Sequence, residues 1–117
     1  MSEEVVRYEF DEAFCEGLVS LCLRDSEFMR RSAQLVEPSY FEKRSEQCAV
    51  QMAKVFFKRY NTAIDRASVV NALKDAIASK IVRDEDKADV RDLIKKCFSN
   101  PLPARAPIEE KVASYLY

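Results

Sequence analysis

The sequence of 117 residues is poor in residues that many turns and functional sites require, with one glycine, no histidine and no tryptophan. A single glycine argues against a fold built from β-hairpins, because their tight turns need residues that tolerate a positive φ. It also excludes a glycine-rich phosphate-binding loop in these residues. Without histidine, Ser20 and Ser26 lack the base that ordinary serine catalysis uses. We therefore predict a binding or structural module, with no enzyme activity and no cofactor in this chain.

Zinc binding is equally poorly supported. The four cysteines, Cys15, Cys22, Cys48 and Cys97, form no CxxC pair, although a zinc site needs closely spaced ligands. We interpret all four as buried free thiols that act as small hydrophobic side chains.

Two acidic stretches raise the question of other metals. Glu9, Asp11, Glu12 and Glu16 could form a metal cluster, but an acid-rich helix start is the commoner explanation. The stretch DEDKAD, at 84–89, lacks the glycine and the spaced oxygen ligands of a calcium loop, so we expect a solvated turn.

Charge and hydropathy limit the partners. The 19 basic and 20 acidic residues give a net charge of −1, so no overall attraction to nucleic acid or to an anionic membrane is expected. The apolar runs are too short to span a bilayer, and the N-terminus lacks the features of a secretory signal. We therefore expect a cytoplasmic protein of one domain that does not contact membranes.

Apolar residues recur at helical spacing in six segments, and no segment shows the alternation of a strand. In chain order, the expected helices begin at Asp11, at Asp25 or Ser26, at Lys43, at Asp65, at Lys87 and at Pro107. Pro38 stops the second helix. The sequence predicts an all-α, compact bundle of about six helices. We expect a frayed segment at 1–9 and a globular core at 10–80, with a hairpin and linker region of the same domain at 81–117.

Packing of the core can be predicted from the apolar stripes. The residues expected to be buried together are Phe14, Leu18, Phe41, Phe56, Leu73 and Ile77. Gly17 lies inside the first helix, where glycine costs about 1 kcal/mol relative to alanine. We therefore expect a neighbouring helix to pack closely against Gly17.

The stretch FFKRY, at 56–60, allows two interpretations. Aromatic rings stack on bases and cations hold phosphates, so this segment could bind nucleic acid together with Lys54, Lys58 and Arg59. Alternatively, Phe56 and Tyr60 are four residues apart and continue the apolar stripe of a core helix. We favour the second interpretation, in which both rings are buried and the three cations form only a weak patch.

The last two helices have apolar faces that could contact another chain. The residues of these faces are Val90, Leu93, Ile94, Phe98, Ile108, Val112 and Leu116. Three prolines separate the helices and predict a stiff, open connector, and no C-terminal cap precedes Tyr117. We predict that the hairpin continues beyond Tyr117 and that these seven residues form a weak homodimer contact.

Three segments resemble the N-terminal domain of DnaB-type replicative DNA helicases, especially the phage members. GLVSLCLRDSEF, at 17–28, is similar to the family's leucine-rich first helix and the acidic turn that closes it. LVEPSYFEKRSEQCAVQMAKVFFKRYNTAID, at 35–65, resembles its pattern of leucine, proline and phenylalanine before a long helix and a turn ending in Ile-Asp. IDRASVVNALKD, at 64–75, is similar to the capped helix that follows. Residues 88–117 resemble, more weakly, the start of the family's helical hairpin.

The resemblance implies a non-catalytic domain that pairs with its neighbours, forms the collar of a hexameric helicase ring and docks primase. ATP and Mg²⁺ would bind only to a downstream motor domain, and DNA would be contacted indirectly. Two alternatives stay open. One is a freestanding helical adaptor that binds a replication or transcription protein, and the other is direct single-strand binding through FFKRY.

Overall fold

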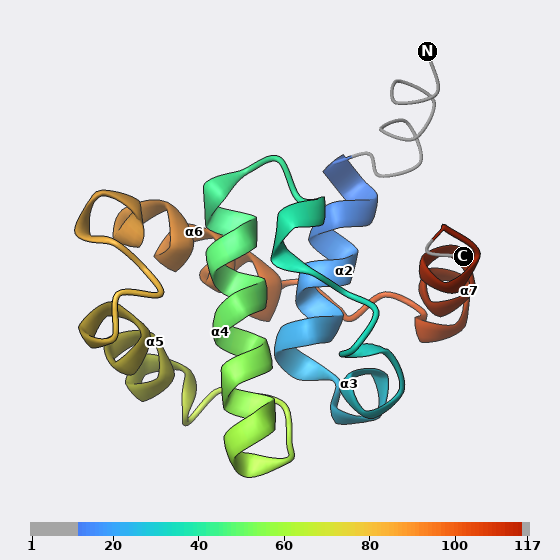
Figure 1. Cartoon of the computed structure of the whole chain (residues 1–117), viewed down its shortest axis with the longest axis horizontal. Helices are drawn as coiled ribbons and strands as arrows, with labels where there is room; N and C mark the ends of the chain where they lie inside the picture. Colours follow the sequence, from blue (N-terminus) through green and yellow to red (C-terminus); the bar gives the residue numbers. More distant parts are fainter. Residues whose placement is uncertain (1–11, 116–117) are drawn as a thin grey trace.

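A computed structural model of the chain describes residues 12–115 (Figure 1). Within this range the chain forms α-helices and two short 3-10 helices, with no strand, which confirms the all-α prediction. The elements are α2 (Glu12–Arg24), α3 (Ser26–Ser32), η1 (Pro38–Tyr40), α4 (Arg44–Tyr60), α5 (Val69–Ala78), η2 (Asp84–Asp86), α6 (Lys87–Ser99) and α7 (Arg105–Tyr115).

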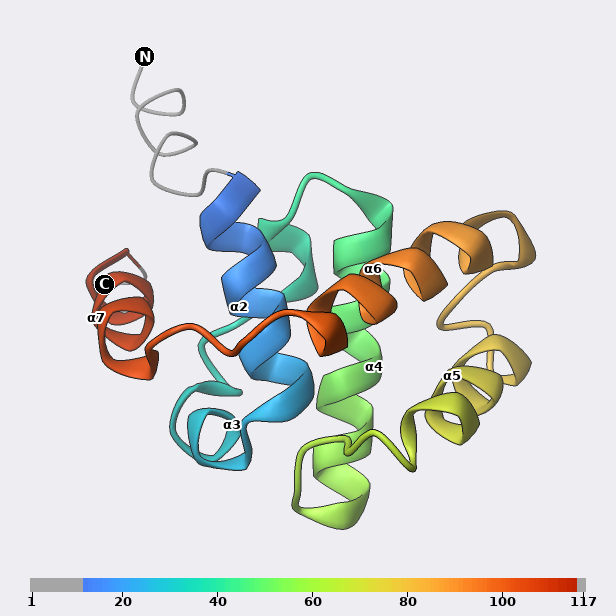
Figure 2. The same ribbon diagram turned by 180° about the vertical axis from the view of Figure 1, so that it is seen from behind.

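Helix α2 lies at the centre of the bundle. Every residue from Leu18 to Leu23 is buried, so this part of α2 has no side that faces solvent. A helix that is buried all round needs neighbours on every side. Helices α3, α4, α6 and α7 all pack against α2 and supply this cover (Figures 1 and 2).

Local sequence signals explain where several elements begin and end. The Asp25 side chain accepts a hydrogen bond of 3.0 Å from the backbone N–H of Phe28 and so caps α3. Helix α4 ends at Asn61, whose φ of 57° is left-handed, a conformation that asparagine tolerates better than most residues. The Asp65 side chain accepts from the N–H of Ser68 and stabilises the turn that leads into α5.

The segment between α3 and α4 differs from the prediction. Helix α3 ends at Ser32, because the chain turns before it reaches Pro38, which instead begins η1. The turn buries Phe41, which is 2% exposed, but leaves Tyr40 41% exposed. Val36, which lies between α3 and η1, is buried as well.

The core is centred on α2 and contains only part of the predicted set. Leu18 and Phe41 are buried as expected, whereas Phe56, Leu73 and Ile77 are only partly buried. Phe14 is also partly buried. Large core side chains outside the predicted core set include Phe28, Val50, Val82 and Val90.

The four cysteines are free and buried, as predicted. Burial raises the pKa of the Cys22 thiol to about 12, and it also raises the pKa values of Cys48 and Cys97. These thiols are therefore neutral in the native fold at physiological pH.

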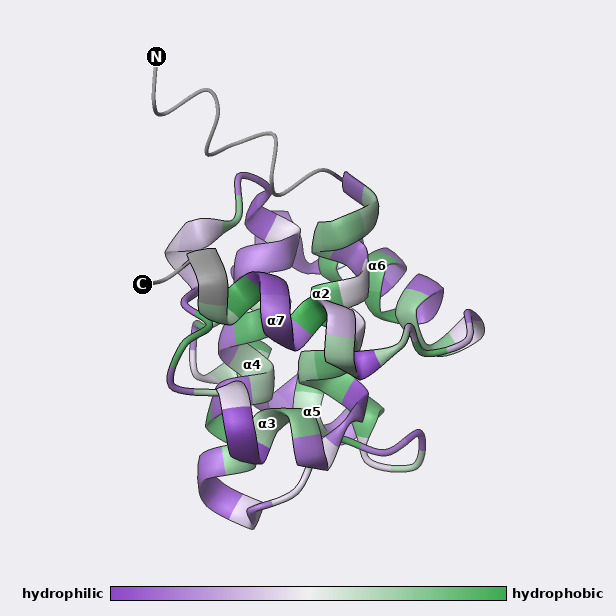
Figure 3. Ribbon diagram, turned by 90° about the vertical axis from the view of Figure 1, so that its right-hand side faces the viewer, coloured by the Kyte–Doolittle hydropathy of each residue, from purple (hydrophilic) through white to green (hydrophobic). Residues whose placement is uncertain are grey.

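Close packing at Gly17 positions the last helix. A Cβ atom at Gly17 would lie 3.3 Å from Ile108 Cδ1 and 3.4 Å from Pro103 Cγ, so the missing side chain lets α7 approach α2. The predicted close packing at Gly17 is confirmed. Ile108 and Val112 are buried on this side of α7, and Figure 3 shows hydrophilic positions on its outward face.

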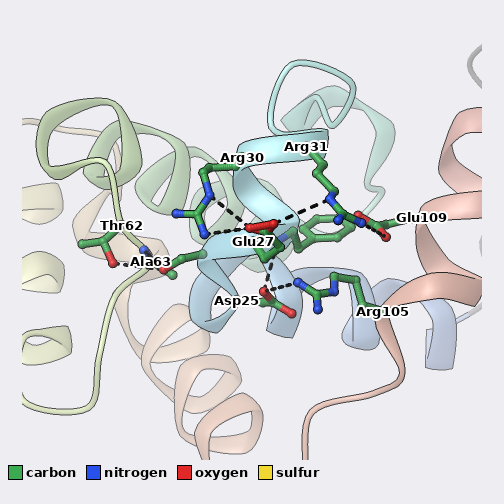
Figure 4. Close-up of polar contacts among 10 residues, drawn as sticks. Asp25, Glu27, Arg30, Arg31, Thr62, Ala63, Arg105 and Glu109 are labelled. Carbon is green, nitrogen blue, oxygen red and sulfur yellow. Dashed lines mark hydrogen bonds and ion pairs between the residues drawn. The ribbon is translucent and has the colours of Figure 1, made fainter.

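The expected C-terminal hairpin is not formed within the described residues. Helix α6 packs against α2 and α4, whereas the main contacts of α7 are with α2 and α3. Two ion pairs add to this attachment of α7 (Figure 4). Arg105 lies 3.3 Å from Asp25, and Arg31 lies 3.6 Å from Glu109. The proline-rich connector therefore takes the chain across α2 instead of back along α6.

The difference between a central and a peripheral leucine is testable. Leu21→Ala removes a fully buried side chain and should lower the free energy of unfolding by about 2–5 kcal/mol. Leu73→Ala removes a partly exposed side chain of α5 and should cost about 1–2 kcal/mol. Urea titration measures both losses, and equal losses would contradict the central position of α2.

The role of Gly17 is tested by enlarging it. Gly17→Leu has no room against Ile108 and Pro103, so it should displace α7 and cost about 1–3 kcal/mol. Hydrogen exchange should then accelerate in α7 while α2 and α4 stay protected. Ala13→Leu, at an exposed position of α2, is the control and should leave α7 protected. Unchanged exchange in α7 of the Gly17 variant would refute this role.

Candidate protein-docking site

The C-terminal end of α4 presents apolar side chains that the described part of the fold leaves uncovered. Helix α4 is 17 residues long and α2 is 13, and α4 extends beyond the end of α2 (Figures 1 and 2). In this part of α4, Val55 is 41% exposed and Tyr60 is 56% exposed. The prediction that Tyr60 is buried is therefore wrong. Phe56, which stacks against it at 4.6 Å between ring centroids, is only partly buried.

A groove of about 510 Å³ runs between this end of α4 and α5, and we call it the α4–α5 groove. Its lining residues are Met52, Val55, Phe56, Lys58, Arg59, Tyr60, Ala72, Asp75, Ala76, Ser79 and Ile81. Met52, Ala72 and Ala76 are buried in its floor, whereas Val55 and Tyr60 are exposed at its edge. Small side chains in the floor and apolar ones at the edge suit contact with another protein segment.

Opposite charges line the two walls of the α4–α5 groove. Lys58 and Arg59 are exposed on α4, and Asp75 is exposed on α5. Among residues 12–115, none of these three side chains forms an ion pair within the chain. The Arg59 guanidinium lies 5.9 Å from the centre of the Tyr60 ring. The groove therefore offers unpaired charges of both signs around an apolar floor.

Lys54 does not belong to the predicted basic patch. Its ammonium group donates a hydrogen bond of 2.8 Å to the backbone oxygen of Val36 and lies 3.7 Å from Glu37. Lys54 therefore connects α4 to the segment that follows α3. Val55 and Lys58 also line a second groove, between α3 and α4, which we call the α3–α4 groove. We call the exposed residues Val55, Lys58, Arg59 and Tyr60 the α4 ridge. Val55 and Lys58 line both grooves, so the ridge lies between them.

Two other cations near this end of the molecule, Arg24 and Arg66, are engaged in the fold. Arg24 donates hydrogen bonds of 2.8 Å to the backbone oxygens of Cys97 and Asn100. Arg66 donates to the backbone oxygen of Phe98, and the two guanidinium groups lie 5.2 and 6.0 Å from the Phe98 ring. Both arginines therefore neutralise the negative C-terminal end of α6.

The predicted self-association face is mostly inside this chain's own core. Val90, Ile94, Ile108 and Val112 are buried against neighbouring helices. Leu93 and Phe98 are partly buried, and Leu116 lies outside the described residues. These residues therefore do not form one exposed face as predicted: α6 packs against α2 and α4, whereas α7 packs against α2 and α3.

Lysines form ion pairs with the two acidic residues in the first part of α2. Glu12 lies 2.8 Å from Lys43, and Glu16 lies 3.0 Å from Lys96. Glu9 and Asp11 lie outside the described residues. The residues that the structure describes include no group of three or more potential ligands for a metal ion. Nor does any of the helices they form have the length and hydropathy to cross a membrane.

The sequence pattern identified FFKRY but missed the α5 wall of the groove. Asp75 and Ala72 carry no signal of a site in the sequence, because only the fold places them opposite Arg59 and Tyr60. The exposure of Tyr60 could have been suspected from its position at the last residue of α4, where a helix often extends past the core.

A buried carboxyl group makes the stability of the bundle depend on pH. Glu46, in the first turn of α4, is 3% exposed, and burial raises its pKa above the ordinary value of 4.5. The native state then binds more protons than the unfolded state, so the contribution of Glu46 is greatest below about pH 4.5 and falls as the pH rises through its raised pKa. Lys43 opposes this shift, and the carboxylates of Glu16, Glu12 and Glu42 add to it.

Glu46→Gln should remove this dependence. The stability of the variant relative to the unsubstituted chain should increase as the pH is raised from 4 to 7, because its amide carries no charge to bury. The melting temperature at both values measures the gain. Glu110→Gln, at an exposed position of α7 that does not influence Glu46, is the control and should show a smaller change. A Glu46 variant that loses stability at pH 7 would show that its carboxylate is favourable where it lies.

A scan against protein-family models, a search of curated proteins and a search of solved structures found no match to this chain. We therefore base the proposed function on the exposed end of α4 and on the segments that resemble a known family.

Proposed function

We propose that this chain is a non-catalytic interaction domain of a DnaB-type replicative DNA helicase, acting in the cytoplasm. The observation that carries the proposal is the exposed ridge of α4 between two grooves. Val55 and Tyr60 present apolar surface there, and Lys58 and Arg59 present cations that no side chain of the described residues neutralises. Such a mixture of exposed apolar and basic side chains suits a protein-docking surface.

The residues behind the resemblance have defined places in the fold, which supports the proposal. Asp25 caps α3, and Phe41 is buried after the proline turn. The backbone N–H of Ile64 donates a hydrogen bond of 2.9 Å to the oxygen of Leu23, which returns the chain to α2 after α4. Asp65 stabilises the next turn. The segments that resemble the family therefore contribute a helix cap, a buried core residue and two turn contacts to this bundle.

In the mechanism we propose, the domain acts by binding other proteins and not by catalysing a reaction. Copies of the domain form the collar of the ring by self-association, and tethering to a ring raises the effective concentration of each weak contact. A primase held by the collar stays beside the template strand. ATP and Mg²⁺ belong to the motor domain in this proposal, and the domain itself contacts DNA only indirectly.

One observation favours a second candidate, direct binding of single-stranded nucleic acid. Tyr60 is exposed beside Arg59 and Lys58, which is the combination that stacks bases and holds phosphates. The groove itself favours a protein, because its floor is apolar and Asp75 lies on the facing wall. A freestanding adaptor would use the same surface for a different protein.

Docking of primase along α4 is testable with a matched pair of substitutions. Val55→Asp places a charge on the ridge shared by both grooves and should weaken binding of a primase from the same source at least about tenfold. Val70→Asp makes the same change on α5 at a residue that lines neither groove, and should leave binding unchanged. Isothermal titration calorimetry measures both affinities.

Two results would count against the proposal. If no primase from that source binds the unsubstituted chain, the helicase assignment loses its main support. If primase binds and the Val55 and Val70 variants weaken it equally, docking occurs elsewhere on the molecule. Circular dichroism checks that both variants stay helical.

A further inference from the structure

Side chains, and no backbone hydrogen bonds, hold α7 on the bundle. Among residues 12–115, no backbone–backbone hydrogen bond joins the segment 101–115 to another element. The apolar side chains of α7 that the structure describes as buried are Ile108 and Val112, four residues apart. The connector PLPA, at 101–104, is irregular and contains two prolines. A helix attached in this way can leave its position without breaking the backbone of the other helices.

Two ion pairs fix the position of α7 (Figure 4). Arg105, the first residue of α7, lies 3.3 Å from Asp25, and Glu109 lies 3.6 Å from Arg31. Arg31 also lies 3.8 Å from Glu27 of its own helix, so two carboxylates share its charge. Glu109 Oε2 is buried and accepts no hydrogen bond from the described residues. A buried acceptor without a donor is unfavourable, so Glu109 holds α7 less firmly than a fully hydrogen-bonded carboxylate would.

The surface under α7 matches one pattern of helix. Ile108 lies against Gly17, where a Cβ atom would come within 3.3 Å of the Ile108 Cδ1 atom. Asp25 pairs with a basic residue three positions before Ile108, and Arg31 pairs with an acidic residue one position after it. A matching helix therefore carries a basic residue, then adjacent apolar and acidic residues one turn later, and a second apolar residue after another turn.

We propose that this surface, which we call the α2–α3 face (Gly17, Asp25 and Arg31), docks a helix of another protein that carries this pattern, and that α7 covers it as an autoinhibitory helix. Because α7 is tethered beside the face, its effective concentration is high and the face stays closed until a partner helix displaces it. A partner whose acidic side chain has hydrogen-bond donors for both oxygens has the advantage over Glu109.

This inference goes beyond the proposed function. The α2–α3 face shares no residue with the α4 ridge, so a helix bound to it does not compete with a protein on the ridge for the same side chains.

A charge reversal tests whether α7 opens separately from the bundle. Arg31→Glu places a carboxylate beside Glu109 and should raise the hydrogen-exchange rates of α7 about three- to tenfold, whereas α2 and α4 stay protected. Adding Glu109→Arg reverses both charges of the pair and should slow the exchange again. Arg30→Glu is the control, since Arg30 is the preceding residue of α3 and pairs with Glu27 rather than with α7.

A separate helix tests the docking surface itself. The probe is a fluorescent peptide of residues 101–115, either unsubstituted or with Glu109→Arg, and fluorescence anisotropy measures its affinity. The Glu109→Arg peptide should bind the Arg31→Glu chain at least about tenfold more tightly than the unsubstituted peptide does, because only its charge at 109 is opposite to that at 31. Binding of the Glu109→Arg peptide to the unsubstituted chain should be weaker, because the chain's own α7 covers the face. Circular dichroism confirms that the variants stay folded.

Four results would overturn the inference. They are unchanged exchange of α7 in Arg31→Glu, equal acceleration in the Arg30→Glu control, loss of protection in α2 and α4 together with α7, and failure of the Glu109→Arg peptide to bind the Arg31→Glu chain. A dimer of the unsubstituted chain that Arg31→Glu abolishes would assign the face to α7 of a second copy instead. Primase docking at Val55 is measured independently of these results, so either proposal can fail without the other.

Discussion

The burial of α2 on every side is the constraint on which the rest of the structure depends. From Leu18 to Leu23 this helix offers only apolar or small side chains, so water must be excluded from its whole circumference. Four other helices are needed to do this. Gly17 extends the cover by letting α7 approach closely, and the ion pairs of Arg105 and Arg31 attach the same helix at its outer side.

The helices around α2 bury apolar side chains in the same core. These include Val90 and Ile94 of α6, which packs against both α2 and α4, and Ile108 and Val112 of α7. Helix α4 is longer than α2, so its last turns pass beyond the region that needs cover. Tyr60, the last residue of α4, is exposed there, and Val55 is exposed five residues earlier on the same helix.

Electrostatics separate the structural cations from those that a partner could use. Arg24 and Arg66 neutralise the end of α6, and Lys54 holds the backbone of Val36. Lys58 and Arg59 have no such engagement among the described residues, although they lie on the same helix as Lys54. This difference locates the candidate docking surface more sharply than the apolar side chains alone.

Asp65 does not cap α5 as predicted, because α5 begins at Val69 after Ser68 and Asp65 instead stabilises the preceding turn. The sequence by itself determined the helical class, most helix positions, the capping role of Asp25, the close packing at Gly17 and the burial of the thiols. Each of these depends on residues that are near one another in the chain or on a single side chain. Only the tertiary structure decided which apolar faces meet. The periodicity of α6 and α7 shows that each has an apolar face, but whether that face meets α2 or another molecule depends on distant segments. For the same reason, Tyr60 continues the stripe of a core helix and is nevertheless exposed, because no neighbouring helix reaches the end of α4 to cover it.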